Sequence, residues 1–121
     1  MPIVDVQVVQ AGGAAYDAAA QPLADALGRA FGSAPGRTWV RVSTLDAACY
    51  AENDVALEAG ELPAFVTVLH AHPPTGAALA AQVLAVTEAV AGWLARPAAR
   101  VHVQVAPAGA GRQAFGGQLV E

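Results

Sequence analysis

The sequence contains no lysine, a single cysteine and few charged residues of either sign. All six basic residues are arginine and ten residues are acidic, which gives a formal net charge of -4 at pH 7. Nucleic acids and anionic membranes bind basic surfaces, so we expect neither as a partner. Cys49 can form neither an intramolecular disulfide nor an all-cysteine metal site. Such sparse cysteine use is typical of a reducing compartment, and we expect a cytoplasmic location.

Two further absences concern membranes. No basic segment followed by an apolar one begins the chain, so no secretory signal is expected. The longest weakly charged stretch, residues 76–95, has about the length that crosses a bilayer. Because Gln82, Thr87 and Glu88 interrupt it and alanine dominates it, we interpret it as an amphipathic helix packed on a core.

Apolar residues in regular patterns are what the sequence does have. Of its 121 residues, 55% are hydrophobic and 13% are charged, which argues against disorder and predicts one domain over residues 1–121. Residues 3–9 and 39–45 each alternate apolar and polar side chains, so both are predicted strands. Between them, large apolar residues at four-residue spacing predict a helix over residues 21–31.

The second half repeats this order after Pro63. Its predicted strand, helix and strand cover residues 64–71, about 75–95, and 100–106. Each half is thus a βαβ unit with parallel strands, and the two halves form pseudo-repeats at about 2–62 and 63–121. Arg41 and His102 hold equivalent places in the two halves.

Two segments fall outside this repeat. Residues 46–62 are polar and irregular, with a short helical turn expected around residues 53–58. At the other end of the second half, Gly116-Gly117 leads into a short predicted strand over residues 118–120.

Three local patterns together resemble the tautomerase superfamily, which includes 4-oxalocrotonate tautomerase and macrophage migration inhibitory factor. They are a Met1-Pro2 start that runs straight into a strand, the strand sequence Val40-Arg41-Val42, and the late Phe115-Gly116-Gly117. The chain looks like a fused two-unit member, and only residues 46–62 have no clear counterpart. The resemblance implies an α+β fold: a four-stranded mixed sheet from two βαβ units, two helices on one face, and assembly as a homotrimer.

The resemblance also implies a catalytic role for Pro2. In this family the initiator methionine is removed, and the secondary amine of the new N-terminal proline is the general acid/base. An ordinary amine is mostly protonated at pH 7, but an apolar pocket and nearby arginines lower its pKa towards neutrality. Alone, a proline at position two carries little weight, because any protein can have one.

Two arginines are the candidate anion holders. Arg41 matches the arginine that binds the substrate carboxylate in this family, and a guanidinium suits a carboxylate bidentately. An exposed strand face or an inter-subunit salt bridge explains it equally well. Arg37 lies where migration inhibitory factor carries a lysine at the pocket mouth, although the residue alone slightly favours a solvated loop arginine.

Three further residues are candidates for binding the substrate. Tyr50 follows the second strand and can donate its hydroxyl to a carbonyl oxygen, or can anchor the loop through its ring. Phe115 can form an apolar wall beside Pro2, or can simply pack. His102 can face the pocket of a neighbouring subunit.

No metal or other cofactor is expected. His70 and His72 share one face of a strand and, with His102, suggest a metal site. However, no carboxylate or cysteine lies at ligand spacing nearby.

The sequence departs from the family in one respect that bears on the substrate. The simplest members carry a Gly-Arg pair after the first strand, where this chain has Gly12-Gly13, and Pro73 stands at the matching place of the second half. One substrate-binding arginine is therefore missing or replaced by Arg37. This favours a monocarboxylate or enol ketone over a dicarboxylate. Residues 46–62 show no obvious acid pair for hydratase or dehalogenase chemistry, although Glu52 and Glu58 stay open.

The leading hypothesis is a tautomerase that converts keto and enol forms of a small 2-oxo acid or related unsaturated acid through Pro2. Two alternatives stay open at this point. One is a ferredoxin-like binding module, which shares the βαββαβ order but needs no Pro2 chemistry. The other is a tautomerase-fold protein without catalysis.

Overall fold

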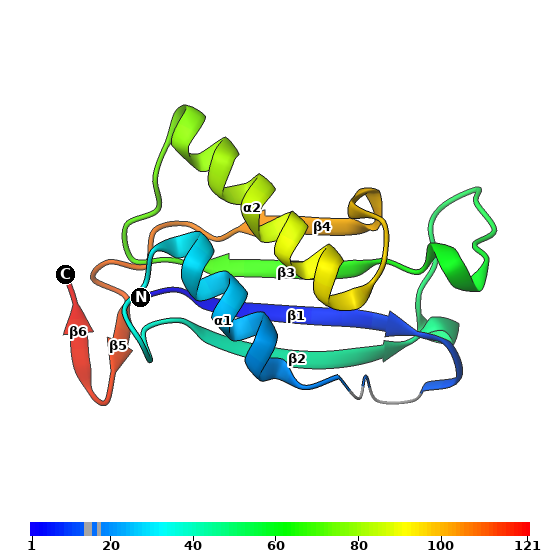
Figure 1. The fold of residues 1–121 in the computed structure, drawn as a ribbon, viewed down its shortest axis with the longest axis horizontal. Helices are drawn as coiled ribbons and strands as arrows, with labels where there is room; N and C mark the ends of the chain where they lie inside the picture. Colours follow the sequence, from blue (N-terminus) through cyan, green and yellow to red (C-terminus); the bar gives the residue numbers. More distant parts are fainter. Residues whose placement is uncertain (14–15, 17) are drawn as a thin grey trace.

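The computed structural model describes residues 1–13, 16 and 18–121. A four-stranded sheet carries two helices, and a small hairpin follows it (Figure 1). The elements are β1 (Ile3–Gln10), α1 (Ala20–Phe31), β2 (Trp39–Asp46), β3 (Ala64–Leu69), α2 (Gly76–Leu94), β4 (Val101–Val105), β5 (Gln113–Phe115) and β6 (Gln118–Val120).

The sheet has the order β2-β1-β3-β4. β1 is parallel to β2, β3 is parallel to β4, and β1 and β3 are antiparallel. Both helices cover the same face, so each half is one βαβ unit whose two strands are direct neighbours (Figure 1). This confirms the predicted mixed sheet. It excludes a ferredoxin-like arrangement, in which the βαβ unit is split by a third strand.

The core lies between the sheet and the helices because the strands alternate. Val4, Val6 and Val8 of β1 are buried against Leu23 and Leu27 of α1, while the intervening polar residues face away from the helices. Four-residue spacing puts both leucines on one side of α1, and this predicted apolar side is the one that packs against the sheet.

α2 is the only helix among the described residues that is long and apolar enough to cross a membrane, by length and composition alone. It packs on the sheet through its C-terminal half, where Val86, Val90 and Leu94 are buried. Thr87 bonds back to the carbonyl of Val83 at 2.8 Å, so this polar group is satisfied within the helix. The buried stripe is the one expected of a core helix.

One prediction about the irregular segments is wrong. No helical turn forms over residues 53–58; Glu52 and Val55 instead make an isolated antiparallel bridge, with Asp54 at a positive φ of 60°. Helical turns occur on either side, at Ala47–Cys49 and Ala59–Glu61. Glu58 and Glu61 form a capping box. Glu58 is its N-cap residue, so the second helical turn begins at Ala59.

Several predicted boundaries also shift. The strand expected to run to residue 71 ends at Leu69, and the strand expected over 100–106 covers Val101–Val105. The strand β5 was not predicted at all; Gly116-Gly117 joins it to β6, so that pair marks a hairpin of which only the second strand was predicted. In the loop after β1, Ala14 and Ala15 lie outside the described residues.

Candidate functional site

The start of β1 forms the first part of the candidate site. Pro2 is fully buried, and its carbonyl oxygen accepts a hydrogen bond from the backbone N–H of Trp39 at 3.1 Å. This bond extends the β1–β2 ladder by one residue, so Pro2 is held at the end of the sheet rather than in a loose terminus. The backbone nitrogen of Pro2 is therefore fixed in position by the strand that follows it.

The hairpin of β5 and β6 supplies an aromatic wall beside this end. Gly116 and Gly117 both have positive φ, 59° and 85°, as a two-residue type I′ turn requires. The hairpin lies next to the N-terminus (Figure 1) and stacks Phe115 on Trp39, with ring centroids 4.4 Å apart and planes 16° apart. The Gly-Gly pair thus folds the hairpin that brings an aromatic ring to the Pro2 end.

Gln113, also in β5, is a site residue that the sequence analysis missed. It is 5% exposed, and its Nε2 donates to the carbonyl oxygen of Met1 at 3.4 Å. Its Oε1 is buried and has no hydrogen-bond partner among residues 1–13, 16 and 18–121. A signal existed in the sequence, because Gln113 lies two positions before Phe115 and strand alternation puts both on one face.

Electrostatics at this end disfavour a protonated amine. Burial lowers the pKa of the Met1 amino group, and the positive charge of Arg37 lowers that pKa further. The pKa of His70 is also lowered, first by burial and then by the charges of the chain terminus and of His72. The His70 Nδ1 accepts a hydrogen bond from the backbone N–H of His72 at 3.1 Å, which fits a neutral imidazole. Burial and the neighbouring positive charges therefore both lower the pKa values of the Met1 amino group and of His70.

Arg41 lies near the middle of the edge strand β2, on the face of the sheet without helices. It is the register partner of Asp5 and makes a bidentate ion pair with it, with bonds of 2.6 and 2.8 Å. The Arg41 and Asp5 side chains are 71% and 48% exposed, so this pair is solvated. Asp5 raises the pKa of Arg41 through this bond and its charge. Within one chain, Arg41 is engaged by Asp5.

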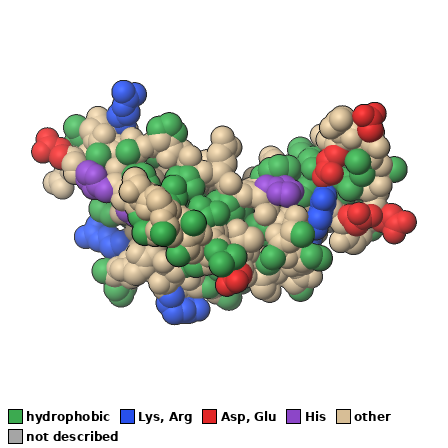
Figure 2. Space-filling view, turned by 90° about the horizontal axis from the view of Figure 1, so that it is seen from above, with side chains coloured by type: hydrophobic (Ala, Val, Ile, Leu, Met, Phe, Trp, Pro, Cys, Tyr) green, Lys and Arg blue, Asp and Glu red, His purple; other side chains and the backbone are tan. Residues whose placement is uncertain are grey.

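The opposite end of the sheet holds a second polar cluster, which we call the far-end cluster: Tyr50, Glu52, Phe65, Arg100 and His102. The Tyr50 hydroxyl and the Arg100 guanidinium both donate to Glu52 Oε2, at 2.6 and 2.8 Å. These two bonds lower the pKa of Glu52, whereas burial and the bond to Glu52 raise that of Tyr50. The Phe65 ring lies 5.7 Å from Tyr50 and 5.5 Å from His102. Figure 2 shows acidic side chains gathered at this end of the molecule.

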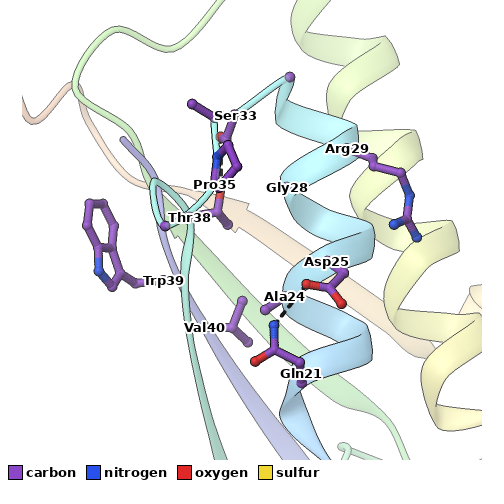
Figure 3. Close-up of a pocket in the computed structure, with 13 residues that line it drawn as sticks. Gln21, Ala24, Asp25, Gly28, Arg29, Ser33, Pro35, Thr38, Trp39 and Val40 are labelled. Atoms are coloured by element: carbon purple, nitrogen blue, oxygen red, sulfur yellow. Dashed lines mark hydrogen bonds between the residues drawn. The ribbon is translucent and has the colours of Figure 1, made fainter.

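A groove of about 790 Å³ lies between α1 and the edge strand β2 (Figure 3). Small residues of α1, including Ala24 and Gly28, leave the space, and Gln21 donates to Asp25, one turn further along the same helix, at 2.9 Å. Trp39 borders the groove but points away from α1 (Figure 3). Its ring stacks on Phe115 instead. The groove brings together no nucleophile with a base, so its volume does not mark the chemistry.

No metal centre is apparent in the part of the chain that the structure describes, where no group of three or more potential ligands forms. His72, one of the histidines considered for a metal, instead bonds through Nε2 to the backbone oxygen of Glu121 at 2.8 Å. His102 lies in the far-end cluster, away from the other two.

The structure therefore divides the predicted site residues into three places. Pro2, Arg37 and Phe115 lie at the N-terminal end of the sheet. Tyr50 and His102 lie at the far end. Arg41 lies between them, beside Asp5. Within a single chain the six residues do not form one pocket.

Comparison with known proteins supplies the fold's identity. No protein-family model matches the sequence, and no curated protein does. A fused 4-OT wild-type asymmetric trimer matches with a TM-score of 0.75 at 20% identity, covering 97% of this chain and 94% of that one. A protein inactivated by 2-oxo-3-pentynoate matches at 0.74 and 15% identity, with the same coverage. A macrophage migration inhibitory factor from Oncomelania hupensis matches at 0.72 and 16% identity, covering 100% of this chain and 83% of that one.

These likenesses extend over nearly the whole chain, and identities this low establish the fold alone. The chain has the fold of the tautomerase superfamily, with β1–α1–β2 and β3–α2–β4 as its two units.

Proposed function

We propose that this chain is an isomerase of the tautomerase type, in which the Pro2 amine, freed by removal of Met1, is the general acid/base. The observation that carries the proposal is the position of Pro2. It is buried at the end of a strand, beside an aromatic stack, in surroundings where burial and Arg37 lower the pKa of an amine. An amine whose pKa lies nearer the working pH is neutral often enough to accept a proton.

The reaction that suits this site interconverts keto and enol forms. The neutral amine takes a proton from a carbon next to a carbonyl and returns one elsewhere on the conjugated system. Arg37 is the residue whose positive charge lowers the pKa of the amino group at this end, and it would hold the carboxylate of a small 2-oxo acid or related unsaturated acid. The chemistry needs no metal or cofactor, because proton transfer and charge stabilisation are both supplied by the chain.

The proposal includes assembly as a homotrimer. A fused 4-OT of the same fold is a trimer. In addition, Phe65 and His102 of the far-end cluster lie in register with Gln7, five residues after Pro2, which separates them from Pro2 by roughly 17 Å at the rise of an extended strand. Tyr50 and His102 can therefore contribute to a Pro2 site only from a second copy, and Arg41 only by exchanging Asp5 for substrate. Sedimentation of the protein at three times the chain mass would support this part of the proposal.

The test combines intact mass with turnover of phenylenolpyruvate. We expect a mass lacking Met1 and enol-to-keto conversion that falls by about 10²-fold or more in Pro2→Ala, the range that one positioned acid/base contributes. Pro107→Ala, at an exposed loop proline, is the matched control and should retain activity.

Two outcomes would contradict the proposal. Retention of Met1 would leave the Pro2 nitrogen in an amide, where it has no basicity. Unchanged turnover in Pro2→Ala would show that the amine is not the base. Absence of turnover in the unaltered protein would favour the remaining alternative, a protein of this fold without catalysis.

A further inference from the structure

The Gln113 side chain is buried with most of its hydrogen-bonding capacity unused. A glutamine amide can donate two hydrogen bonds and accept two. Here it makes one bond, of 3.4 Å, from Nε2 to the Met1 carbonyl, while Oε1 is buried without a partner. Buried polar groups are normally paired, so an amide in this state calls for an explanation.

Packing alone does not explain why this residue is a glutamine. The side chain fits closely against Gly109, where an added Cβ would lie 3.1 Å from Gln113 Oε1 and 3.2 Å from Leu69 Cδ1. The cradle therefore fits the shape of this side chain, but the shape could equally be filled by an apolar residue of the same length. Such a residue would avoid the cost of burying an unpaired amide.

The hydrogen-bond acceptor of Gln113 Nε2 indicates the role of this amide. The Met1 carbonyl is the group attached directly to the Pro2 nitrogen, so it lies along the valence that becomes free when Met1 is removed. A substrate carbon that exchanges a proton with that nitrogen must approach along the same direction. Without Met1, the buried amide of Gln113 loses its only protein partner among the described residues.

We propose that Gln113 is a substrate-binding residue whose Nε2 donates a hydrogen bond to the 2-oxo (enol) oxygen of a substrate bound at Pro2. This inference rests on the proposed function. Negative charge develops on that oxygen when the neighbouring carbon is deprotonated, and a preorganised donor in a buried site stabilises it. Arg37 would hold the carboxylate, so the two residues divide the 2-oxo acid between them.

The test compares Gln113→Met with wild type on phenylenolpyruvate. Methionine is unbranched and of similar length, so it fills the cradle without a donor. We expect kcat to fall by about a hundredfold, as for loss of one oxyanion donor, with little change in KM. The thermal midpoint should be unchanged or higher, because an unpaired buried amide is removed. Gln118→Met, at an exposed glutamine of the same hairpin, should match wild type in all three.

A second variant keeps the test decisive if the methionine variant folds poorly. Gln113→Glu has the same shape, but its ionised carboxylate can only accept hydrogen bonds. It should be nearly inactive at neutral pH, and its activity relative to wild type at the same pH should rise as the pH falls and the carboxyl group becomes a donor. A ratio of variant to wild-type activity that is the same at every pH would overturn the inference.

Labelling gives an independent measure. The reagent 2-oxo-3-pentynoate inactivates a protein of the same fold and carries the 2-oxo oxygen that Gln113 should contact. Mass spectrometry should find the adduct on Pro2, and Gln113→Met should slow its formation. If Pro2→Ala is inactive while Gln113→Met turns over and labels like wild type, this inference fails and the proposed function stands. If wild type neither turns over nor labels, both fail together.

Discussion

The two ends of the sheet treat their polar groups in opposite ways. At the N-terminal end, an amine is placed where burial and Arg37 disfavour its charge, and the Gln113 amide keeps only one long bond. At the far end, Glu52 accepts two short bonds, from Tyr50 and from Arg100. Arg100 Nε is also buried without a partner, but the charges there neutralise each other. A buried amide with incomplete hydrogen bonding, next to an amine whose pKa is lowered, indicates a ligand site. A neutralised ion pair indicates structural support.

The aromatic residues give the largest expected contrast. Phe115→Ala removes the stack on Trp39 and should lower the free energy of unfolding by about 2 kcal/mol. It should also raise the pKa of the N-terminal amine, because water enters and burial is its first cause of depression. Chemical denaturation and an NMR titration of the amine measure the two effects.

Phe65→Ala is the matched change at the far end, where the ring is 36% exposed. It should lower the free energy of unfolding by less than Phe115→Ala does, and it should leave the pKa of the N-terminal amine unchanged. Equal effects of the two substitutions on that pKa would remove the distinction between the ends.

The far-end ion pair is expected to matter for stability. Arg100→Met removes the guanidinium from Glu52 and should lower the free energy of unfolding by a small amount, because the carboxylate keeps only Tyr50. The pKa of Glu52 should rise, since the Arg100 bond contributes to its depression. The lowered pKa of Glu52 stabilises the folded protein at neutral pH, and this contribution is lost as the pH falls through the pKa in the folded state. The difference in stability between Arg100→Met and wild type should therefore shrink in acid.

Urea unfolding at neutral and acidic pH measures this difference. Arg29→Met, at an exposed arginine of α1, serves as the control and should behave like wild type. A difference that grows in acid would contradict the assigned role of Arg100.

The smallest expected change in stability comes from Arg37. Arg37→Ala alters an exposed loop residue and should shift the free energy of unfolding by less than about 0.5 kcal/mol. Its effect should appear in the amine instead. Removing a positive charge favours the ammonium form, so the amine pKa rises and the acidic limb of the pH–rate profile moves to higher pH. A profile identical to wild type would show that Arg37 does not act on the amine.

Local pattern was sufficient for the regular elements. The alternation in β1 and the leucine spacing in α1 predict which residues are buried, because pleat and helical turn assign a face to each position. The same reasoning failed over residues 53–58, where a turn with Asp54 at positive φ replaced the expected helix. A single local side-chain contact determines the conformation of such a segment, and hydrophobic periodicity carries no information about that contact.

The candidate site was only partly predictable for the same reason. Pro2 and Phe115 were found through resemblance, and the structure places them at one end. Tyr50 and His102 were weaker candidates than Pro2 in the sequence, as Phe115 was, and they lie at the other end of the sheet. Gln113 was missed because a buried unpaired amide is a property of its surroundings rather than of its residue type.

The sequence by itself determined the number, order and buried faces of the main strands and helices. These features follow from short-range periodicity, and the hydrophobic effect turns each apolar stripe towards a common core. The tertiary structure alone decided that β5 returns to the start of β1, so that Gln113 meets Met1 more than a hundred residues away and Phe115 stacks on Trp39. Such contacts depend on how packed elements meet, and no local pattern contains that information.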